Sequence, residues 1–129
     1  MKMKPGEATK KKLRVLIVDD SDEIRATLTR ALSRLPRVQV VGEAVDGLQA
    51  MECVRTLKPD VVTLDIRMPK MNGIEVLKAI RHEGHECLVI ILSVGVEDIQ
   101  RLKCLQLGAQ HVFDKVTEFE KAIQVLRTL

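Results

Sequence analysis

Five short runs of apolar, often β-branched residues recur along the chain, and each is followed by a stretch in which apolar residues return every three or four positions. The first pattern is typical of buried strands and the second of amphipathic helices. Strands that alternate with helices predict a parallel sheet covered on both faces, because right-handed crossovers place helices there. We therefore expect an α/β fold with a doubly wound, five-stranded parallel sheet and five helices. The runs are Leu13–Val18, Val38–Glu43, Asp60–Leu64, Leu88–Leu92 and His111–Phe113.

The fourth helix has the least regular apolar pattern of the five. It starts within Ser93–Asp98 and ends near Gly108, since glycine commonly follows the last turn of a helix. Its expected apolar stripe consists of Ile99, Leu102 and Leu105.

Length and composition indicate a single globular domain. With 129 residues, 46% of them hydrophobic and 30% charged, the chain can bury a sizeable core. It has no long apolar run of the kind that spans a membrane, and no apolar stretch follows its charged N-terminus before Leu13. We expect a cytoplasmic protein without membrane contact.

Positive charge is concentrated at the N-terminus. Residues 1–12 hold five lysines and one glutamate, so the net charge of +3 leaves residues 13–129 with a net charge of −1. Residues 1–12 also lack periodicity, and we expect a disordered basic tail ahead of a domain that spans residues 13–129. No aromatic residues interleave with these charges, and no direct contact with nucleic acid is expected.

Polar side chains stand where the predicted strands end. Every strand-to-helix loop of a doubly wound parallel sheet opens on the same edge, so residues far apart in sequence converge there. The run Val61–Leu64 delivers Asp65 to this edge, just before a loop that contains Pro69 and Gly73. The residues at the predicted edge are Asp19, Asp20, Asp65, Ser93 and Lys115.

This set has the composition of a metal-assisted phosphoryl-transfer site. Three carboxylates repel one another and need a cation, and an all-oxygen set suits octahedral Mg²⁺ better than Zn²⁺. The hydroxyl of Ser93 and the ammonium of Lys115 match the charge of a phosphoryl group. With Mg²⁺ and Lys115 neutralising the charge, Asp65 is expected to attack phosphorus through an in-line, loose transition state.

The same residues resemble the receiver domain of two-component response regulators. The resemblance covers residues 13 to 128 and rests on the acidic pair after the first strand, the segment Asp65–Gly73, and the Ser and Lys after the fourth and fifth strands. It implies a flavodoxin-like fold of five strand–helix units. It also implies that Asp65 accepts a phosphoryl group from a histidine of a sensor kinase or a phosphotransfer protein.

The resemblance implies a role for each neighbour of Asp65. Asp20 would ligate Mg²⁺ directly and Asp19 mainly through water, with the backbone carbonyl of Arg67 as a further ligand. Ser93 would bond one phosphoryl oxygen, and Lys115 would pair with another. Such a domain is not an enzyme in the usual sense, because it catalyses only its own aspartyl phosphorylation and dephosphorylation.

Three features depart from the usual pattern of the family. Val116 follows the lysine where a proline in a cis peptide bond is usual, so a trans bond is expected. Val112 stands where a switch aromatic is often found, and the neighbouring Phe113 should point to the opposite face of the strand. Arg67 and Gly95 occupy positions that tend to govern the access of water to the acyl phosphate.

Two other kinds of protein share parts of this pattern. A dehalogenase-type phosphatase also uses a nucleophilic Asp, Mg²⁺, a hydroxyl and a lysine, but its nucleophile lies on the first strand with a second Asp two residues later. Here Asp65 follows the third predicted strand instead of lying on the first, and the residue two positions later is Arg67. A flavodoxin would share the sheet, yet its FMN ring is normally flanked by aromatic residues, and this chain has no Trp, no Tyr and two Phe.

The chain ends after its fifth predicted helix, so we expect a single-domain receiver, similar to a chemotaxis regulator, that signals by protein–protein contact. Its downstream partner is expected on the face formed by the fourth helix, fifth strand and fifth helix, which borders Ser93 and Lys115. The alternative is a receiver excised from a DNA-binding transcriptional regulator, since Val41–Ala44 with Asp46 and Gly47 resembles receivers fused to such domains. The length of the native reading frame separates the two.

Overall fold

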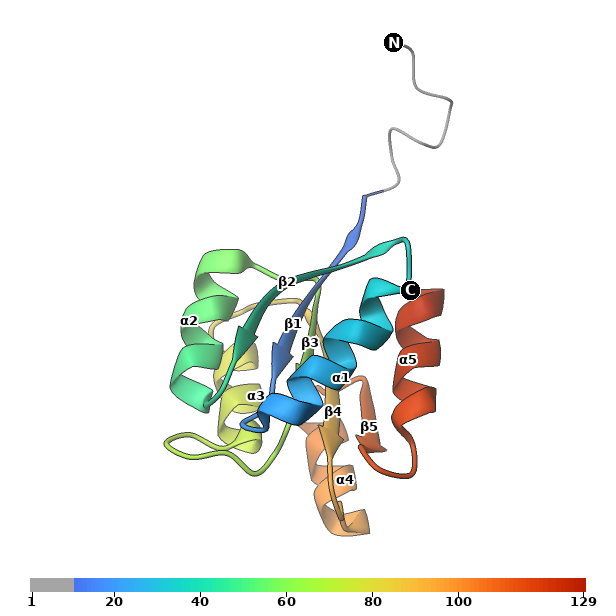
Figure 1. Cartoon of the computed structure of the whole chain (residues 1–129). Coiled ribbons are helices and arrows are strands. Elements are labelled where there is room, and N and C mark those ends of the chain that lie inside the picture. Colours follow the sequence, from blue (N-terminus) through green and yellow to red (C-terminus); the bar gives the residue numbers. More distant parts are fainter. Residues whose placement is uncertain (1–10) are drawn as a thin grey trace.

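The five predicted strands form one sheet in the computed structural model, which describes residues 11–129 (Figure 1). All strand pairs are parallel, in the order β2-β1-β3-β4-β5. The predicted doubly wound sheet with five helices is confirmed. In chain order the elements are β1 (Leu13–Val18), α1 (Asp22–Ser33), β2 (Val38–Ala44), α2 (Gly47–Leu57), β3 (Val61–Leu64), α3 (Gly73–His82), β4 (Leu88–Ser93), α4 (Asp98–Gln106), β5 (His111–Asp114) and α5 (Phe119–Thr128).

The sheet separates two hydrophobic layers, because alternate strand residues point to opposite faces. On β1, Leu16 and Val18 pack with residues of α2, α3 and α4, whereas Val15 and Ile17 pack with residues of α1 and α5. All four side chains are at most 1% exposed. Figure 1 shows the result, with α1 and α5 together on one face of the sheet and α2 and α3 on the other.

Short polar side chains begin the helices that follow β1 and β3. Ser21 caps α1 by accepting a hydrogen bond from the backbone N–H of Ile24. Asn72 forms a capping box with Glu75 at the start of α3. Such caps satisfy backbone donors that a helix leaves free in its first turn, and each contributes about 1 kcal/mol. The two caps fix the first turns of α1 and α3, which follow the loops that contain Asp19, Asp20 and Asp65.

The fourth helix differs from its prediction. Its apolar stripe faces solvent: Ile99 is 80%, Leu102 57% and Leu105 43% exposed. Cys104 is the buried residue of α4, and Arg101 reaches the sheet by donating a hydrogen bond to the backbone carbonyl of Val112. An apolar stripe usually faces the core, and that expectation was wrong here because α4 lies against the short edge strand β5, which offers little surface to cover.

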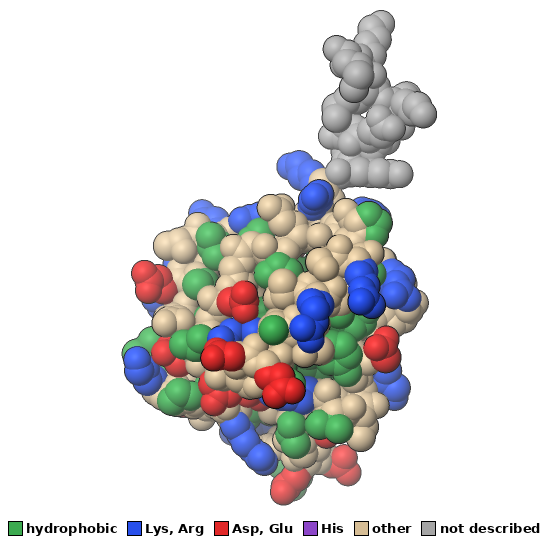
Figure 2. Space-filling view, in the orientation of Figure 1, with side chains coloured by type: hydrophobic (Ala, Val, Ile, Leu, Met, Phe, Trp, Pro, Cys, Tyr) green, Lys and Arg blue, Asp and Glu red, His purple; other side chains and the backbone are tan. Residues whose placement is uncertain are grey.

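The predicted basic tail and the absence of a membrane-spanning helix were two further expectations. Of the predicted basic tail at residues 1–12, residues 1–10 lie outside the part of the chain that the structure describes. Within residues 11–129, no helix is both long enough and apolar enough to cross a bilayer. Figure 2 shows acidic side chains gathered around the start of α1, where Asp20, Asp22 and Glu23 are exposed.

Candidate active site

Asp19 and Asp65 lie beside each other because β1 and β3 are neighbours in the sheet. Val18 pairs with Leu64 at the ends of these strands, and the backbone N–H of Asp65 donates to the carbonyl of Val18 at 3.0 Å. From this pair of strands the sheet extends toward β2 on one side and toward β4 on the other. Such a topological switch point is where doubly wound sheets bind ligands.

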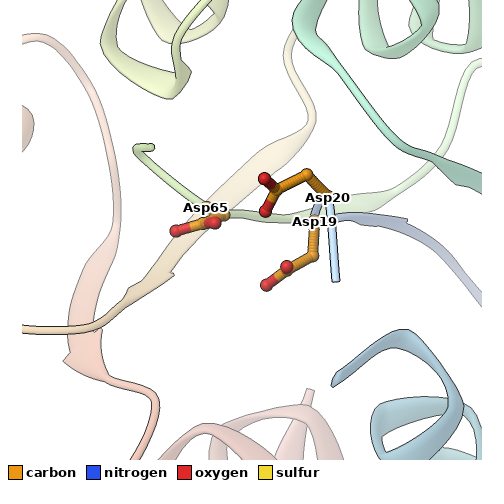
Figure 3. Close-up of side chains that lie close together, drawn as sticks. All are labelled: Asp19, Asp20 and Asp65. Atoms are coloured by element: carbon orange, nitrogen blue, oxygen red, sulfur yellow. The ribbon is translucent and has the colours of Figure 1, made fainter. Parts of the chain in front are cut away.

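Three carboxylates meet at this edge (Figure 3). Ligand oxygens of Asp19, Asp20 and Asp65 all lie within 4.8 Å of one another, and the side chains point into a common space. Asp19 is 2% and Asp65 4% exposed, whereas Asp20 is exposed and leaves the cluster open to water on its side. An all-oxygen, negatively charged set that is open to solvent fits a hard divalent cation with several bound waters.

The predicted hydroxyl and ammonium groups both contact the carboxylates. Ser93, the last residue of β4, donates a hydrogen bond to Oδ1 of Asp65 at 2.7 Å. Lys115 follows β5 and places its Nζ 2.6 Å from Oδ2 of Asp19 and 3.4 Å from Oδ2 of Asp65. The structure therefore brings together the five side chains predicted from the strand ends. That Lys115 lies nearer to Asp19 than to Asp65 is a feature the sequence analysis did not predict.

Burial has the largest effect on the pKa of Asp65. Loss of hydration raises the pKa of its carboxyl, and the negative charge of Asp19 raises this pKa further. The hydrogen bond from Ser93 and the positive charge of Lys115 act in the opposite direction without reversing the shift. A cation among the three carboxylates would favour the ionised form of Asp65.

Two carboxylates hold Lys115 in its charged form. Burial disfavours the ammonium, but the hydrogen bond to Asp19 and the charges of Asp65 and Asp19 outweigh burial, so the pKa of Lys115 is raised. The lysine side chain is 8% exposed. It therefore supplies a positive charge at a defined place beside Asp65.

The loop after Asp65 is held tightly where α3 begins. The backbone N–H of Gly73 donates to the carbonyl of Ile66 at 2.8 Å, and a Cβ atom on Gly73 would lie 2.0 Å from the carbonyl oxygen of Asp65. Glycine is therefore required at the start of α3. Arg67 lies in an exposed part of this loop, and the role predicted for its backbone carbonyl as a metal ligand stays a prediction.

A buried arginine that the sequence analysis missed supports the acidic loop. Arg25, which is 9% exposed, donates to the backbone carbonyl of Asp19 at 2.6 Å and to Glu43 at 3.2 Å, and it pairs with Asp22. These contacts anchor the chain between β1 and α1. The one signal in the sequence was the three-residue spacing of Asp22 and Arg25, which also occurs on solvated helix faces.

Comparisons with known proteins show the family of this chain. The family model for the response regulator receiver domain matches residues 15–127. A protein-glutamate methylesterase/protein-glutamine glutaminase of Vibrio vulnificus is 43% identical over 107 residues, which are 81% of this chain and 31% of that protein. The chain thus spans less than a third of the length of this relative.

Two solved structures are similar over nearly their whole length. The response regulator domain of Thermotoga maritima CheB has a TM-score of 0.82 at 34% identity, and the match covers 92% of this chain and 98% of that chain. The signal receiver domain of the response regulator NarL from Mycobacterium tuberculosis has a TM-score of 0.82 at 37% identity, with the same two coverages.

Proposed function

The chain belongs to the family of response regulator receiver domains, and we propose that its Asp65 accepts a phosphoryl group in a two-component system of the cytoplasm. The donor is the phosphohistidine of a sensor kinase or of a histidine phosphotransfer protein. One observation carries the proposal. The buried carboxylate of Asp65 contacts the hydroxyl of Ser93 at 2.7 Å and the ammonium of Lys115 at 3.4 Å, beside two further carboxylates.

Mg²⁺ is the cation that fits this site. Asp19, Asp20, Asp65 and the backbone carbonyl of Arg67 would hold it, Asp20 directly and Asp19 mainly through water. Mg²⁺ prefers oxygen ligands and keeps several waters, which suits three carboxylates of which one lies at the surface. When bound, it neutralises negative charge on the nucleophile and on the incoming phosphoryl group.

The chain's own groups account for the transfer step. An oxygen of Asp65 attacks phosphorus, and an acyl phosphate forms as the phosphorus–nitrogen bond breaks and its electron pair returns to the donor histidine. Lys115 then pairs with a phosphoryl oxygen, and Ser93 turns its hydroxyl from the carboxylate of Asp65 to another phosphoryl oxygen. Hydrolysis of the acyl phosphate restores Asp65, so the domain turns over only its own phosphoryl group.

The phosphorylated domain acts by contact with a downstream protein. Ser93 and Lys115 end β4 and follow β5, so their movement reaches the face formed by α4, β5 and α5. Contiguous exposed apolar residues often mark protein–protein contacts. The exposed apolar side chains near this face are Val94, Ile99, Leu102, Leu105 and Val116. We place the output contact there.

A second candidate function is that of a regulatory domain within a longer protein. The observation in its favour is coverage: the chain matches less than a third of the Vibrio vulnificus methylesterase but nearly all of the Thermotoga maritima CheB response regulator domain. Phosphorylation would then control an attached effector, either an enzyme or a DNA-binding domain. The length of the native reading frame distinguishes an attached effector from a separate one.

The decisive experiment measures intact mass after incubation with Mg²⁺ and phosphoramidate, a small phosphodonor. The wild type should gain one hydroxylamine-labile phosphoryl group, whereas Asp65→Asn should gain none, because an amide has the same shape but is not a usable nucleophile. Asp98→Asn is the matched control, since Asp98 is an exposed carboxylate outside the pocket. A phosphoryl group that is stable to hydroxylamine, or one that persists in Asp65→Asn, would contradict the proposal.

A further inference from the structure

Asp114 ties together the two loops that carry Ser93 and Lys115. Its Oδ2 accepts a hydrogen bond from the backbone N–H of Gly95 at 3.1 Å, across the gap between the β4–α4 and β5–α5 loops. Its Oδ1 accepts from the backbone N–H groups of Val116 at 2.8 Å and Thr117 at 3.0 Å, within its own loop. One carboxylate therefore bonds each loop through a different oxygen.

The same residue is connected to the fourth helix. The backbone N–H of Asp114 donates to Oε1 of Glu118 at 3.0 Å, and Arg101 of α4 lies 3.4 Å from that same oxygen. Arg101 also donates to the backbone carbonyl of Val112, two residues before Asp114. A continuous chain of contacts thus runs from the Gly95 loop through Asp114 and Glu118 to α4.

An aromatic side chain cannot carry the signal along this route. Val112, on the face of β5 that packs toward α4, is aliphatic and 4% exposed. Phe113 packs in the opposite layer, with residues of α1 and α5. Besides the backbone of the β4–α4 loop, the polar contacts of Asp114, Glu118 and Arg101 join the loops beside the pocket to α4.

We infer that Asp114 is a positioning residue that makes the Ser93 and Lys115 loops move as one unit and passes this movement to α4. The inference rests on the proposed function, since the movement begins when a phosphoryl group on Asp65 draws Ser93 and Lys115 toward it. The two loops also share a backbone hydrogen bond, from Lys115 N–H to the carbonyl of Ser93 at 3.1 Å. That bond lies at the strand ends, whereas the carboxylate of Asp114 forms hydrogen bonds with both loops further from the strands.

The hydrogen bond between Gly95 and Asp114 holds the β4–α4 loop at a sharp turn. The φ of Gly95, +63°, lies in the left-handed region that favours glycine, so the loop turns sharply there and has no side chain of its own to hold it. The bond from Oδ2 of Asp114 is the contact that fixes the Gly95 amide. The three amides also lower the pKa of Asp114, with Thr117 and Val116 ahead of Gly95, so the carboxylate remains a charged acceptor near neutral pH.

Asp114→Asn separates coupling from a purely local role. An asparagine has one acceptor oxygen, which can still serve Val116 and Thr117, but its NH₂ group cannot accept from Gly95. The turn after β5 is therefore kept while the bond between the loops is lost. Asp114→Ala removes both, and Asp98→Asn removes one exposed negative charge from the start of α4 without touching these contacts.

The experiment records amide NMR shifts of the wild type and the three variants, with and without Mg²⁺ and beryllofluoride as the phosphoryl mimic. In the wild type and in Asp98→Asn, the mimic should shift amides around Asp65, Ser93 and Lys115 and also along residues 98–106. In Asp114→Asn the pocket shifts should persist, those along residues 98–106 should be lost, and the Gly95 amide should exchange about tenfold faster. Phosphorylation of Asp65 by phosphoramidate should remain detectable by mass.

The outcomes separate the two proposals. If the mimic shifts no amides in the wild-type pocket, the proposed function fails. If the wild-type pocket and α4 both respond and Asp114→Asn responds in the same way, the function stands and the role of Asp114 is refuted. A loss of the α4 response in Asp114→Ala alone would show that the residue acts only through its own turn, which also refutes the coupling role.

Discussion

At the scale of single residues, two buried hydroxyl groups near Asp65 differ in what they contact. Ser93 is 2% exposed, and its hydroxyl donates to Asp65 and accepts from the backbone N–H of Ile66 at 3.4 Å. Thr63, two residues before Asp65 on β3, is 1% exposed, but its hydroxyl has no partner among the described residues. Of these two hydroxyl groups, that of Ser93 is the one that contacts the carboxylate of Asp65, whereas an unpaired buried hydroxyl such as that of Thr63 costs free energy.

Ser93→Ala should leave Asp65 able to accept a phosphoryl group but weaken the response that follows. A hydrogen bond to a charged phosphoryl oxygen offers about 1.5–3 kcal/mol, which corresponds to about a 10- to 100-fold bias toward the activated form. Intact mass reports phosphorylation, and NMR shifts along α4 report the response. Thr63→Val is the control and should alter neither. A full α4 response in Ser93→Ala would show that the hydroxyl has no part in the switch.

At the scale of secondary-structure elements, an ion pair joins the carboxyl ends of α2 and α3. Arg55 donates through Nε to Oε1 of Glu83 at 3.0 Å and through a terminal nitrogen to Oε2 at 2.6 Å, and His85 lies 3.1 Å from Oε1. The contact with Arg55, followed by that with His85, lowers the pKa of Glu83 to about 2. An arginine that donates to both oxygens of a carboxylate is the kind of surface ion pair that stabilises a fold measurably.

The pH dependence of folding should reveal this pair. Because the pKa of Glu83 is lower in the folded state than in the unfolded state, its stabilising effect is present above the unfolded pKa near 4.5 and is lost as the pH falls toward 2. Glu83→Gln should therefore unfold at lower urea than the wild type at pH 7, and the gap should close between pH 4.5 and pH 2. Glu52→Gln, an exposed site on α2, is the control. A gap that does not change with pH would exclude the ion pair as its cause.

At the scale of the whole molecule, the sheet distributes apolar side chains unevenly. Its central strands are covered by helices on both faces, so leucines of α1 and α3 are buried, whereas α4 at the β5 edge exposes its leucines. Leu32 is 0% and Leu102 57% exposed. Leucine therefore contributes to the hydrophobic core in α1 and to the exposed surface in α4.

Alanine substitution should affect the free energy of unfolding differently at Leu32 and Leu102. Leu32→Ala leaves a cavity between α1 and the sheet and should lower the free energy of unfolding by about 2–5 kcal/mol. Leu102→Ala should change it by no more than about 0.5 kcal/mol, because no core contact is lost. Urea denaturation of both variants measures the difference. A loss of more than about 2 kcal/mol in Leu102→Ala would place α4 in the core and contradict the output surface proposed for it.

Reading the amino-acid sequence alone was enough to predict the order of elements, the parallel sheet and the edge at which five polar side chains meet, namely Asp19, Asp20, Asp65, Ser93 and Lys115. These features depend on local periodicity and on the rule that loops after parallel strands open together, and both can be read from neighbouring positions along the chain.

The pairing of groups from separate loops could not be predicted from the sequence and became visible in the folded protein. The burial of Arg25 under the acidic loop, the contact of Lys115 with Asp19, and the bridge from Asp114 to Gly95 each join segments whose separation depends on how neighbouring elements pack. The outward stripe of α4 has the same origin, since periodicity states which residues share a helix face but not how much of the sheet remains for that face to cover.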